Sequence, residues 1–161
     1  MHIEVMAGIY SRYWPADTPA HVIQTEIIRH ASQLELIRVP HGGRVIDVGC
    51  GWGAFAAGCA SLGYRVTMVD DHGDAGFADA ADLRHRIPAD FDISAVRFNA
   101  VRDPWPFPAD SLDAVTTFDS MEHWHDSPKR LFGDIARSLK PGGWLVIGVP
   151  NAANLKNAST P

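Results

Sequence analysis

The amino-acid sequence predicts a doubly wound α/β domain built on a parallel sheet. Three observations predict it: short apolar segments rich in β-branched residues, segments with helical spacing between most of them, and glycine-containing turns. The apolar segments show little polar alternation, so helices are expected on both faces of the sheet. A chain of 161 residues suffices for one substantial core. We therefore expect residues 1–161 to form a single domain, with an N-terminal lead (1–20), a core (21–150) and a polar tail (151–161).

The first part of the core predicts a helix, a strand and a second helix. After a proline-containing lead from Tyr10 to Pro19, apolar residues recur at roughly helical spacing from His21 to Val39. The β-branched run from Arg44 to Val48 then predicts a buried strand that ends in glycines. The alanine-rich segment from Ala54 to Leu62 predicts a closely packed helix, which completes one strand-turn-helix unit.

A second unit follows with the same organisation. Gly63 is a typical helix stop, and the segment from Tyr64 to Val69 predicts a second strand. A helix is expected from about Ala75 to Ile87. The segment from Ser94 to Phe98 predicts a weaker third strand, which brings the chain to a proline-rich loop.

The last part of the core predicts a strand, a helix and a final strand. Leu112 to Phe118 is the fourth strand, and Pro128 to Leu139 is a helix with apolar residues on one face. The sequence from Lys140 to Gly143 is expected to close that helix, and Trp144 to Val149 is the fifth strand. No internal repeat or low-complexity segment is present.

Charge and apolar patterning favour a small-molecule partner. The net charge is −5, from 14 basic and 19 acidic residues, and no basic run suggests binding to nucleic acid or an anionic membrane. The apolar stretches are too short to span a bilayer, and the N-terminus lacks the pattern of a secretory signal. We expect a cytoplasmic protein in which Cys50 and Cys59 stay reduced.

The turn after the first strand carries the clearest binding signal. Gly49 and Gly51 permit a close approach of a ligand to the backbone, and the turn leads into a helix N-terminus. The spacing from Gly49 to Ala54 also fits a dinucleotide-binding fingerprint. Asp70, at the end of the second strand, suits the ribose hydroxyls of an adenosine in either case. Asp71 and Asp74 are interpreted as solvated loop acids near a helix N-terminus.

Four segments in order closely resemble the class I S-adenosylmethionine-dependent methyltransferases, over about residues 39–151. They are VIDVGCGWGAF (Val45 to Phe55), MVDD (Met68 to Asp71), PWPFPADSLDAVTTFDSMEHW (Pro104 to Trp124) and HDSPKRLFGDIARSLKPGGWLVIGVPN (His125 to Asn151). The resemblance implies a Rossmann-like sheet of strand order 3-2-1-4-5 and S-adenosylmethionine as cofactor. Asp47, the Pro-Phe-Pro loop and the Pro-Gly-Gly turn belong to this family and argue against the dinucleotide interpretation.

The resemblance also implies a set of cofactor-binding residues. Gly49 and Gly51 would pass beneath the methionine part, and Asp47 would help to hold its ammonium group. Asp70 would take the ribose hydroxyls. The remaining positions are Asn99 and Ala100 beside the adenine, with Phe118 and Asp119 flanking the methyl group.

Few side chains are needed for the chemistry, because a sulfonium carries an activated methyl group that must only be aligned with a nucleophile away from water. A general base is required only for a hydroxyl or protonated amine acceptor, and His123, past the fourth strand, is a candidate. A role of His123 in shaping its loop is the alternative. His123 and His125 resemble a metal pair, but no third ligand is evident nearby, and no metal is expected.

Several alternatives remain open at the level of sequence. Tyr10, Tyr13 and Trp14 form either a lid over the cofactor or an apolar anchor for the first helix. The chain ends before the last two strands of the family, so a truncated chain is expected, or an exposed fifth strand that promotes self-association. A non-enzymatic cofactor-binding module is the main rival to a methyltransferase, followed by an NAD(P)-dependent oxidoreductase. The methyl acceptor is not identified, because this fold serves many acceptors.

Overall fold

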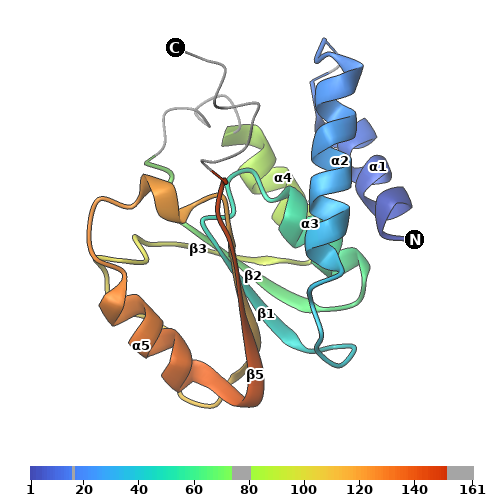
Figure 1. Ribbon diagram of the computed structural model, residues 1–161. Coiled ribbons are helices and arrows are strands. Elements are labelled where there is room, and N and C mark those ends of the chain that lie inside the picture. Colours follow the sequence, from blue (N-terminus) through green and yellow to red (C-terminus); the bar gives the residue numbers. More distant parts are fainter. Residues whose placement is uncertain (16, 74–80, 152–161) are drawn as a thin grey trace.

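The computed structural model describes residues 1–15, 17–73 and 81–151. In this part of the chain, five strands form one sheet in the order β3-β2-β1-β4-β5, and every neighbouring pair is parallel (Figure 1). The strands are β1 (Arg44–Val48), β2 (Arg65–Asp70), β3 (Ser94–Arg97), β4 (Leu112–Phe118) and β5 (Leu139–Gly148). The predicted fold class and strand order are confirmed.

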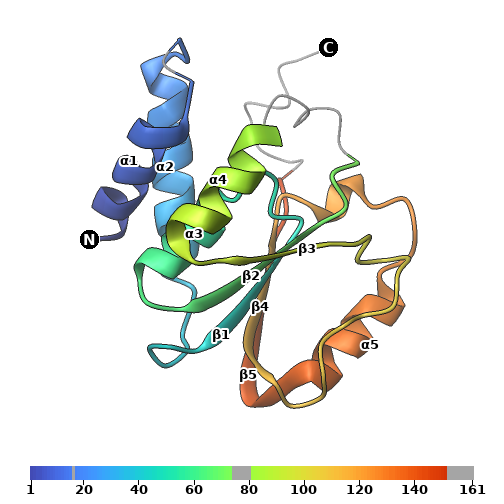
Figure 2. The ribbon, with the colours of Figure 1, turned by 180° about the vertical axis from the view of Figure 1, so that it is seen from behind.

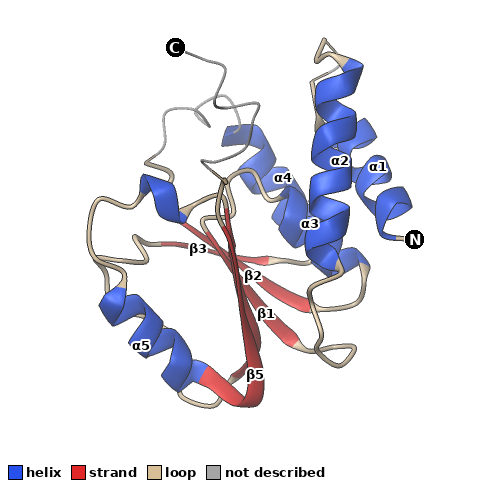
Figure 3. Cartoon of the chain, in the orientation of Figure 1, coloured by secondary structure: helices blue, strands red, loops and turns tan. Residues whose placement is uncertain are grey.

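Helices cover both faces of the sheet (Figures 2 and 3). The helices on one face are α1 (His2–Tyr13), α2 (Ala20–Leu34), α3 (Ala54–Ser61) and α4 (Ala81–Phe91). Helix α5 (Lys129–Ser138) lies on the other face, and a short 3₁₀ helix, η2 (Met121–His123), follows β4. Each face has its own apolar cluster, as the near-continuous apolar strands require.

Strand β1 lies at the centre of the sheet because it is apolar on both faces. Val45 packs in the cluster beneath α1 and α3, whereas Ile46 and Val48 pack in the cluster beneath α5. The exposed fraction of these three side chains is 2% or less. Residues of β1 pair with β2 on one side and β4 on the other, so the carboxyl ends of three strands meet at one edge.

Most predicted boundaries agree with the structure, and β4 has the predicted bounds. Helix α2 is shorter than the predicted helix, since it ends at Leu34 rather than at Val39. Val39 precedes a proline, and a residue in that position disfavours the helical conformation. The fifth strand is longer, because Leu139 already pairs with Leu112 before a register irregularity and the Pro-Gly-Gly turn. The turn therefore interrupts a strand rather than closing a helix.

Helix α4 differs from the expected segment at its C-terminal end. It continues to Phe91 with Pro88 inside it, in the last turn, where the missing proline N–H removes only one hydrogen bond of the helix. Residues 75–80 of the predicted helix, as well as Asp74 and residues 152–161 of the predicted tail, lie outside the described residues.

The N-terminal lead contains α1, a helix that the sequence analysis does not predict. Tyr10 and Tyr13 are almost completely buried, with exposed fractions of 1% and 5%. The Tyr10 hydroxyl lies 2.8 Å from Nδ1 of His30 on α2, and the Tyr13 hydroxyl donates to the Asp90 carboxylate on α4. These contacts support the anchor, one of the two alternatives for the aromatic residues of the lead.

Neither membrane-spanning helices nor disulfides occur in the described part of the chain. No described helix combines the length and apolar character that crossing a membrane requires. Cys50 and Cys59 are free thiols, and burial raises the pKa of each well above its usual value. Both thiols are therefore protonated and poorly nucleophilic near neutral pH.

Candidate functional site

A cavity of about 470 Å³ opens at the carboxyl ends of the central strands, where a doubly wound sheet binds its ligands. Its walls come from the segments that follow β1, β2, β3 and β4. The lining residues are Val48, Gly49, Gly51, Val69, Asp70, Asp71, Gly73, Phe98, Asn99, Ala100, Val101, Arg102, Asp119, Ser120, Glu122, His123, Trp124, His125 and Asp126. Most of the predicted cofactor-binding residues are thus brought together, but Asp47 and Phe118 do not line the cavity.

The glycine turn after β1 requires glycine at two positions, because each has a positive φ and a close neighbour in the space of a β-carbon. Gly49 has a positive φ of 71°, and a β-carbon there would overlap with the Ser120 hydroxyl. Gly53 has a φ of 96°, and a β-carbon there would lie only 2.7 Å from Cε of Met68. The turn is therefore in close contact with the end of β4 on one side and with β2 on the other.

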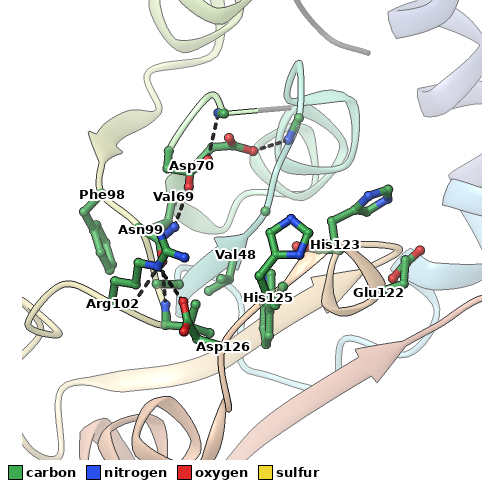
Figure 4. A pocket seen from close by; sticks show the side chains of 18 of the residues that line it. Val48, Val69, Asp70, Phe98, Asn99, Arg102, Glu122, His123, His125 and Asp126 are labelled. Carbon is green, nitrogen blue, oxygen red and sulfur yellow. Dashed lines mark hydrogen bonds and ion pairs between the residues drawn. The ribbon is translucent and has the colours of Figure 1, made fainter. Parts of the chain in front are cut away.

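Asp70 fastens the glycine turn to the end of β2. One carboxylate oxygen accepts the Gly51 N–H at 3.0 Å (Figure 4), and the other accepts the His72 N–H at 2.7 Å. Burial is the main factor that lowers the pKa of His72 below its usual value, so this imidazole is neutral near pH 7. The Asp70 carboxylate is held by backbone donors at the cavity wall, with no need for a cationic side chain.

Asp47 is buried beneath the glycine turn rather than exposed to the cavity. Its exposed fraction is 3%, and one carboxylate oxygen accepts a hydrogen bond of 2.8 Å from the Thr116 hydroxyl on β4. Burial raises the pKa of Asp47 to about 7, the hydrogen bond from Thr116 opposes this shift, and the negative charge of Asp70 adds to it.

Asn99 shapes the wall that follows β3. Its amide oxygen accepts the backbone N–H groups of Val101 and Arg102, and its amide nitrogen donates to Asp71 at 2.6 Å. Asp71 therefore lines the cavity and holds Asn99 in place. The interpretation of Asp71 as a solvated loop acid is therefore wrong, because its carboxylate binds Asn99 at the cavity wall.

The end of β4 separates two predicted residues. Phe118 is partly buried and packs edge-on against Phe55 of α3, with ring centroids 4.9 Å apart, at the border of the core. Asp119 lines the cavity in a left-handed conformation with a φ of 49°. Its carboxylate forms an ion pair with Arg29, which also pairs with Glu26 of α2. This network joins helix α2 to the cavity wall.

The segment from η2 to α5 forms the wall opposite the predicted adenosine side. Figure 4 shows Asp70 and Asn99 on one side of the cavity and Glu122, His123 and His125 on the other. An ion pair between Arg102 and Asp126 connects the two walls. In the described ranges, no cluster of three or more His, Cys, Asp or Glu side chains is arranged to hold a metal ion.

A sequence profile of a family described as "Methyltransferase domain" matches residues 20–159. The chain belongs to this family. The resemblance to class I S-adenosylmethionine-dependent methyltransferases is thereby confirmed. The profile covers the whole described sheet of this methyltransferase domain, including the glycine turn and every segment that lines the cavity.

Two curated relatives of the methyltransferase domain are ubiquinone biosynthesis O-methyltransferases. The one from Burkholderia thailandensis is 35% identical over 117 residues, which cover 72% of this chain and 47% of the relative. The one from Xanthomonas axonopodis pv. citri is 32% identical over 154 residues, covering 92% of this chain and 60% of the relative. The chain thus spans about half the length of the curated relatives it matches.

Among solved structures, coclaurine N-methyltransferase bound to N-methylheliamine and SAH is similar in fold. The TM-score is 0.61 at 19% sequence identity, over 83% of this chain and 38% of that protein. At this level of identity the comparison supports the fold of the methyltransferase domain.

Sequence reasoning missed several cavity residues because their positions depend on contacts between distant segments. Ser120 reaches Gly49 only because β1 and β4 are neighbours. Arg102 and Asp126 meet across the gap between the β3 and β4 loops. The one signal available in the sequence was position, since Ser120 and Arg102 follow shortly after predicted strands.

Proposed function

We propose that this methyltransferase domain binds S-adenosylmethionine in the cavity and transfers its methyl group to a small-molecule acceptor. The observation that carries the proposal is the joint placement of Gly49, Gly51, Asp70 and Asn99 around one cavity within a methyltransferase-family chain. Carboxylates at the cavity wall suit ribose hydroxyls as well as the cationic groups of this cofactor. The residues present therefore fit the cofactor.

Each wall has its own part in the proposed binding mode. Asp70 accepts the ribose hydroxyls, and Asn99 and Ala100 lie beside the adenine. The glycine turn lies along the methionine part, and Asp47 attracts the ammonium group electrostatically from beneath the turn. Asp119 flanks the methyl group directly, whereas Phe118 supports that region from the core.

When bound, the cofactor supplies a methyl group activated by its sulfonium. The domain aligns the acceptor and excludes water at the wall formed by η2 and the segment after it. The names of the curated relatives favour a hydroxyl acceptor. His123 lines this wall and is the candidate that removes the hydroxyl proton during transfer.

The net charge favours a small-molecule partner. A charge of −5 without a basic run favours a small, uncharged or cationic acceptor over nucleic acid or an anionic membrane surface, and a cytoplasmic location is part of the proposal. Self-association through β5 is also proposed, because Trp144 and Ile147 expose 45% and 44% of their surface on β5, the outermost strand within the described residues. Analytical ultracentrifugation should detect a dimer that Trp144→Glu weakens.

Isothermal titration with S-adenosylmethionine, its demethylated product S-adenosylhomocysteine and NAD tests the binding proposal. The first two should bind, NAD should not, and Asp70→Ala should abolish binding. Asp82→Ala is the matched control, because Asp82 lies on the exposed surface of α4 with 74% of its side chain exposed. Binding of NAD alone would favour the oxidoreductase alternative. Cofactor binding without turnover of any hydroxyl acceptor would favour the non-enzymatic module.

A further inference from the structure

The Asp47 carboxylate has one hydrogen-bond donor, and that donor comes from the neighbouring strand. Asp47 pairs with Thr116 across the ladder between β1 and β4, and the Thr116 hydroxyl donates to it at 2.8 Å. The exposed fraction of Thr116 is 0% and that of Asp47 is 3%. No other hydrogen bond to this carboxylate occurs within the described residues. The orientation of the Asp47 side chain therefore depends on a single hydroxyl.

Within the described residues, no cationic side chain balances the charge of Asp47. In the described part of the chain no arginine, lysine or histidine forms an ion pair with it. The ionisable groups that face it are Asp70 at the end of β2, Cys50 in the glycine turn and Cys59 on α3. Both thiols are neutral, because burial raises the pKa of each. Only negative charge thus faces the carboxylate.

The glycine turn consequently lies between two carboxyl groups. Asp70 accepts the Gly51 N–H on one side of the turn, and Asp47 lies beneath its start. The negative charge of Asp70 opposes ionisation of the buried Asp47, and a cation bound nearby would offset this effect. The amino-acid end of the proposed cofactor carries such a cation, its ammonium group.

Resting on the proposed function, we propose that Thr116 is a positioning residue that holds the Asp47 carboxylate beneath the glycine turn, and that binding of the cofactor's ammonium group on the cavity side of the turn releases one proton from Asp47 to solvent. The proton balance is simple. The free protein carries Asp47 largely as the neutral acid below neutral pH, and the complex carries it as the carboxylate, which the positive charge of the ammonium on the cavity side of the turn favours. No other bond forms or breaks.

The expected pH dependence follows from the environment of Asp47. Burial raises its pKa to about 7, the Thr116 hydroxyl lowers it and Asp70 raises it. Affinity for an ammonium ligand should therefore rise with pH up to about 7 and then level off, because the proton no longer has to be displaced. Loss of the Thr116 hydroxyl removes the one contact that favours the carboxylate, so the plateau should move to higher pH.

Isothermal titration of the full chain with S-adenosylhomocysteine tests this inference, between about pH 5.5 and about pH 8 in buffers that differ in ionisation enthalpy. 5′-Deoxy-5′-methylthioadenosine is the matched ligand, because it keeps the adenosine and the thioether but lacks the amino-acid end. The variants are Thr116→Val, which removes the hydroxyl, and Thr116→Ser, which keeps it. Thr117→Val is the control, because the adjacent Thr117 hydroxyl is also buried but has no hydrogen-bond partner within the described residues.

Thr116→Val should weaken binding of S-adenosylhomocysteine about tenfold at neutral pH and move the plateau up by about one pH unit. Thr116→Ser should restore most of the affinity, and Thr117→Val should leave it unchanged. Wild-type protein should release close to one proton per S-adenosylhomocysteine bound below about pH 6.5, and none with the amine-free ligand.

Two results separate this inference from the proposed function. Binding of S-adenosylhomocysteine without proton release, or with equal effects of Thr116→Val and Thr117→Val, overturns the role of Thr116 and leaves the binding proposal standing. If Thr116→Val does not fold, the wild-type protein still tests the inference. Equal proton release with the two ligands would overturn it. Absence of any S-adenosylhomocysteine binding to the wild-type chain overturns the proposed function and this inference together.

Discussion

The hydroxyl oxygen of Ser120 occupies the space that a β-carbon on Gly49 would fill. The contact connects the turn after β1 with the segment after β4, and both residues line the cavity. Gly49 also has a positive φ of 71°, a conformation that glycine adopts without strain. Close approach and backbone conformation therefore require glycine at this position independently.

Replacement of Gly49 by alanine separates these two requirements. We expect Gly49→Ala to reduce the free energy of unfolding by about 2 to 4 kcal/mol, the sum of backbone strain and overlap with Ser120. The double variant Gly49→Ala with Ser120→Gly should recover the overlap component but not the strain. Urea denaturation of the single and double variants measures the coupling. Additive effects would show that the two side chains do not compete for this space.

A second prediction concerns the stability contributed by Asp47. Its pKa is raised to about 7 in the folded chain, above the value of about 3.9 expected when unfolded, so the folded state binds the proton more tightly. Between these values the contribution of Asp47 to the free energy of unfolding should fall as pH rises, because the unfolded state holds fewer protons at this site. Asp47→Asn should remove this loss and be more stable than wild type near pH 7 by about 2 to 4 kcal/mol.

Thermal and urea denaturation of Asp47→Asn at several pH values check this expectation. The variant and the wild type should converge near pH 4, where the wild-type side chain is neutral in the folded state. The same variant should bind S-adenosylhomocysteine less tightly. A wild-type stability that rises steadily from pH 4 to 7 in step with that of Asp47→Asn would contradict the prediction.

Asp113 gives the opposite pH dependence at the other end of the strands. Its carboxylate accepts the Lys140 ammonium at 2.7 Å and the Arg44 N–H at 2.8 Å, and these contacts hold its pKa below the usual value. The stabilisation is present above the unfolded pKa and is lost as pH falls through the folded pKa. Asp113→Asn should cost about 1 kcal/mol at pH 7 and progressively less in acid. The exposed Asp82→Asn serves as control, and equal effects of the two variants in denaturation would argue against the contact.

The buried pair of Tyr10 and His30 should contribute to the docking of α1 on α2. Burial, followed by the charge of Arg29, lowers the pKa of His30 to about 3, so the ring is neutral and needs its partner. Tyr10→Phe should reduce the free energy of unfolding by about 1 to 2 kcal/mol, because one ring nitrogen then has no partner. Tyr64→Phe is the matched control, since the Tyr64 hydroxyl makes no hydrogen bond within the described residues. Equal urea midpoints for the two variants would show that the pair adds nothing.

The fold was predictable because its central strands are apolar and end in recognisable turns. The bounds of β4 could be predicted from Leu112 to Phe118, and the positions after the strands indicated where the cavity lies. Helix α1 was not predicted, although Met6, Ile9, Tyr10 and Tyr13 form its buried face at helical spacing. The helical spacing becomes evident only when residues 1–9 are combined with the start of the proline-containing lead, because α1 spans both.

The site was predictable only as far as local position determines it. Gly49, Gly51 and Asp70 follow their strands directly and line the cavity as expected. Phe118 also ends a strand, but its side chain packs against Phe55 at the border of the core, which depends on how α3 packs. The ion pair of Arg102 with Asp126 depends on the distance between two loops that no sequence pattern specifies.

The arrangement of β1 between β2 and β4 also determines the order in which a growing polypeptide can fold. Val45 pairs with Val66 on one side, but on the other side it pairs with Ala114, so one edge of β1 stays open during synthesis until β4 has left the ribosome. Non-local parallel pairing of this kind forms slowly and leaves an apolar strand edge accessible to other chains. Nascent chains of this protein are therefore expected to keep one edge of β1 unpaired until the fourth strand is available.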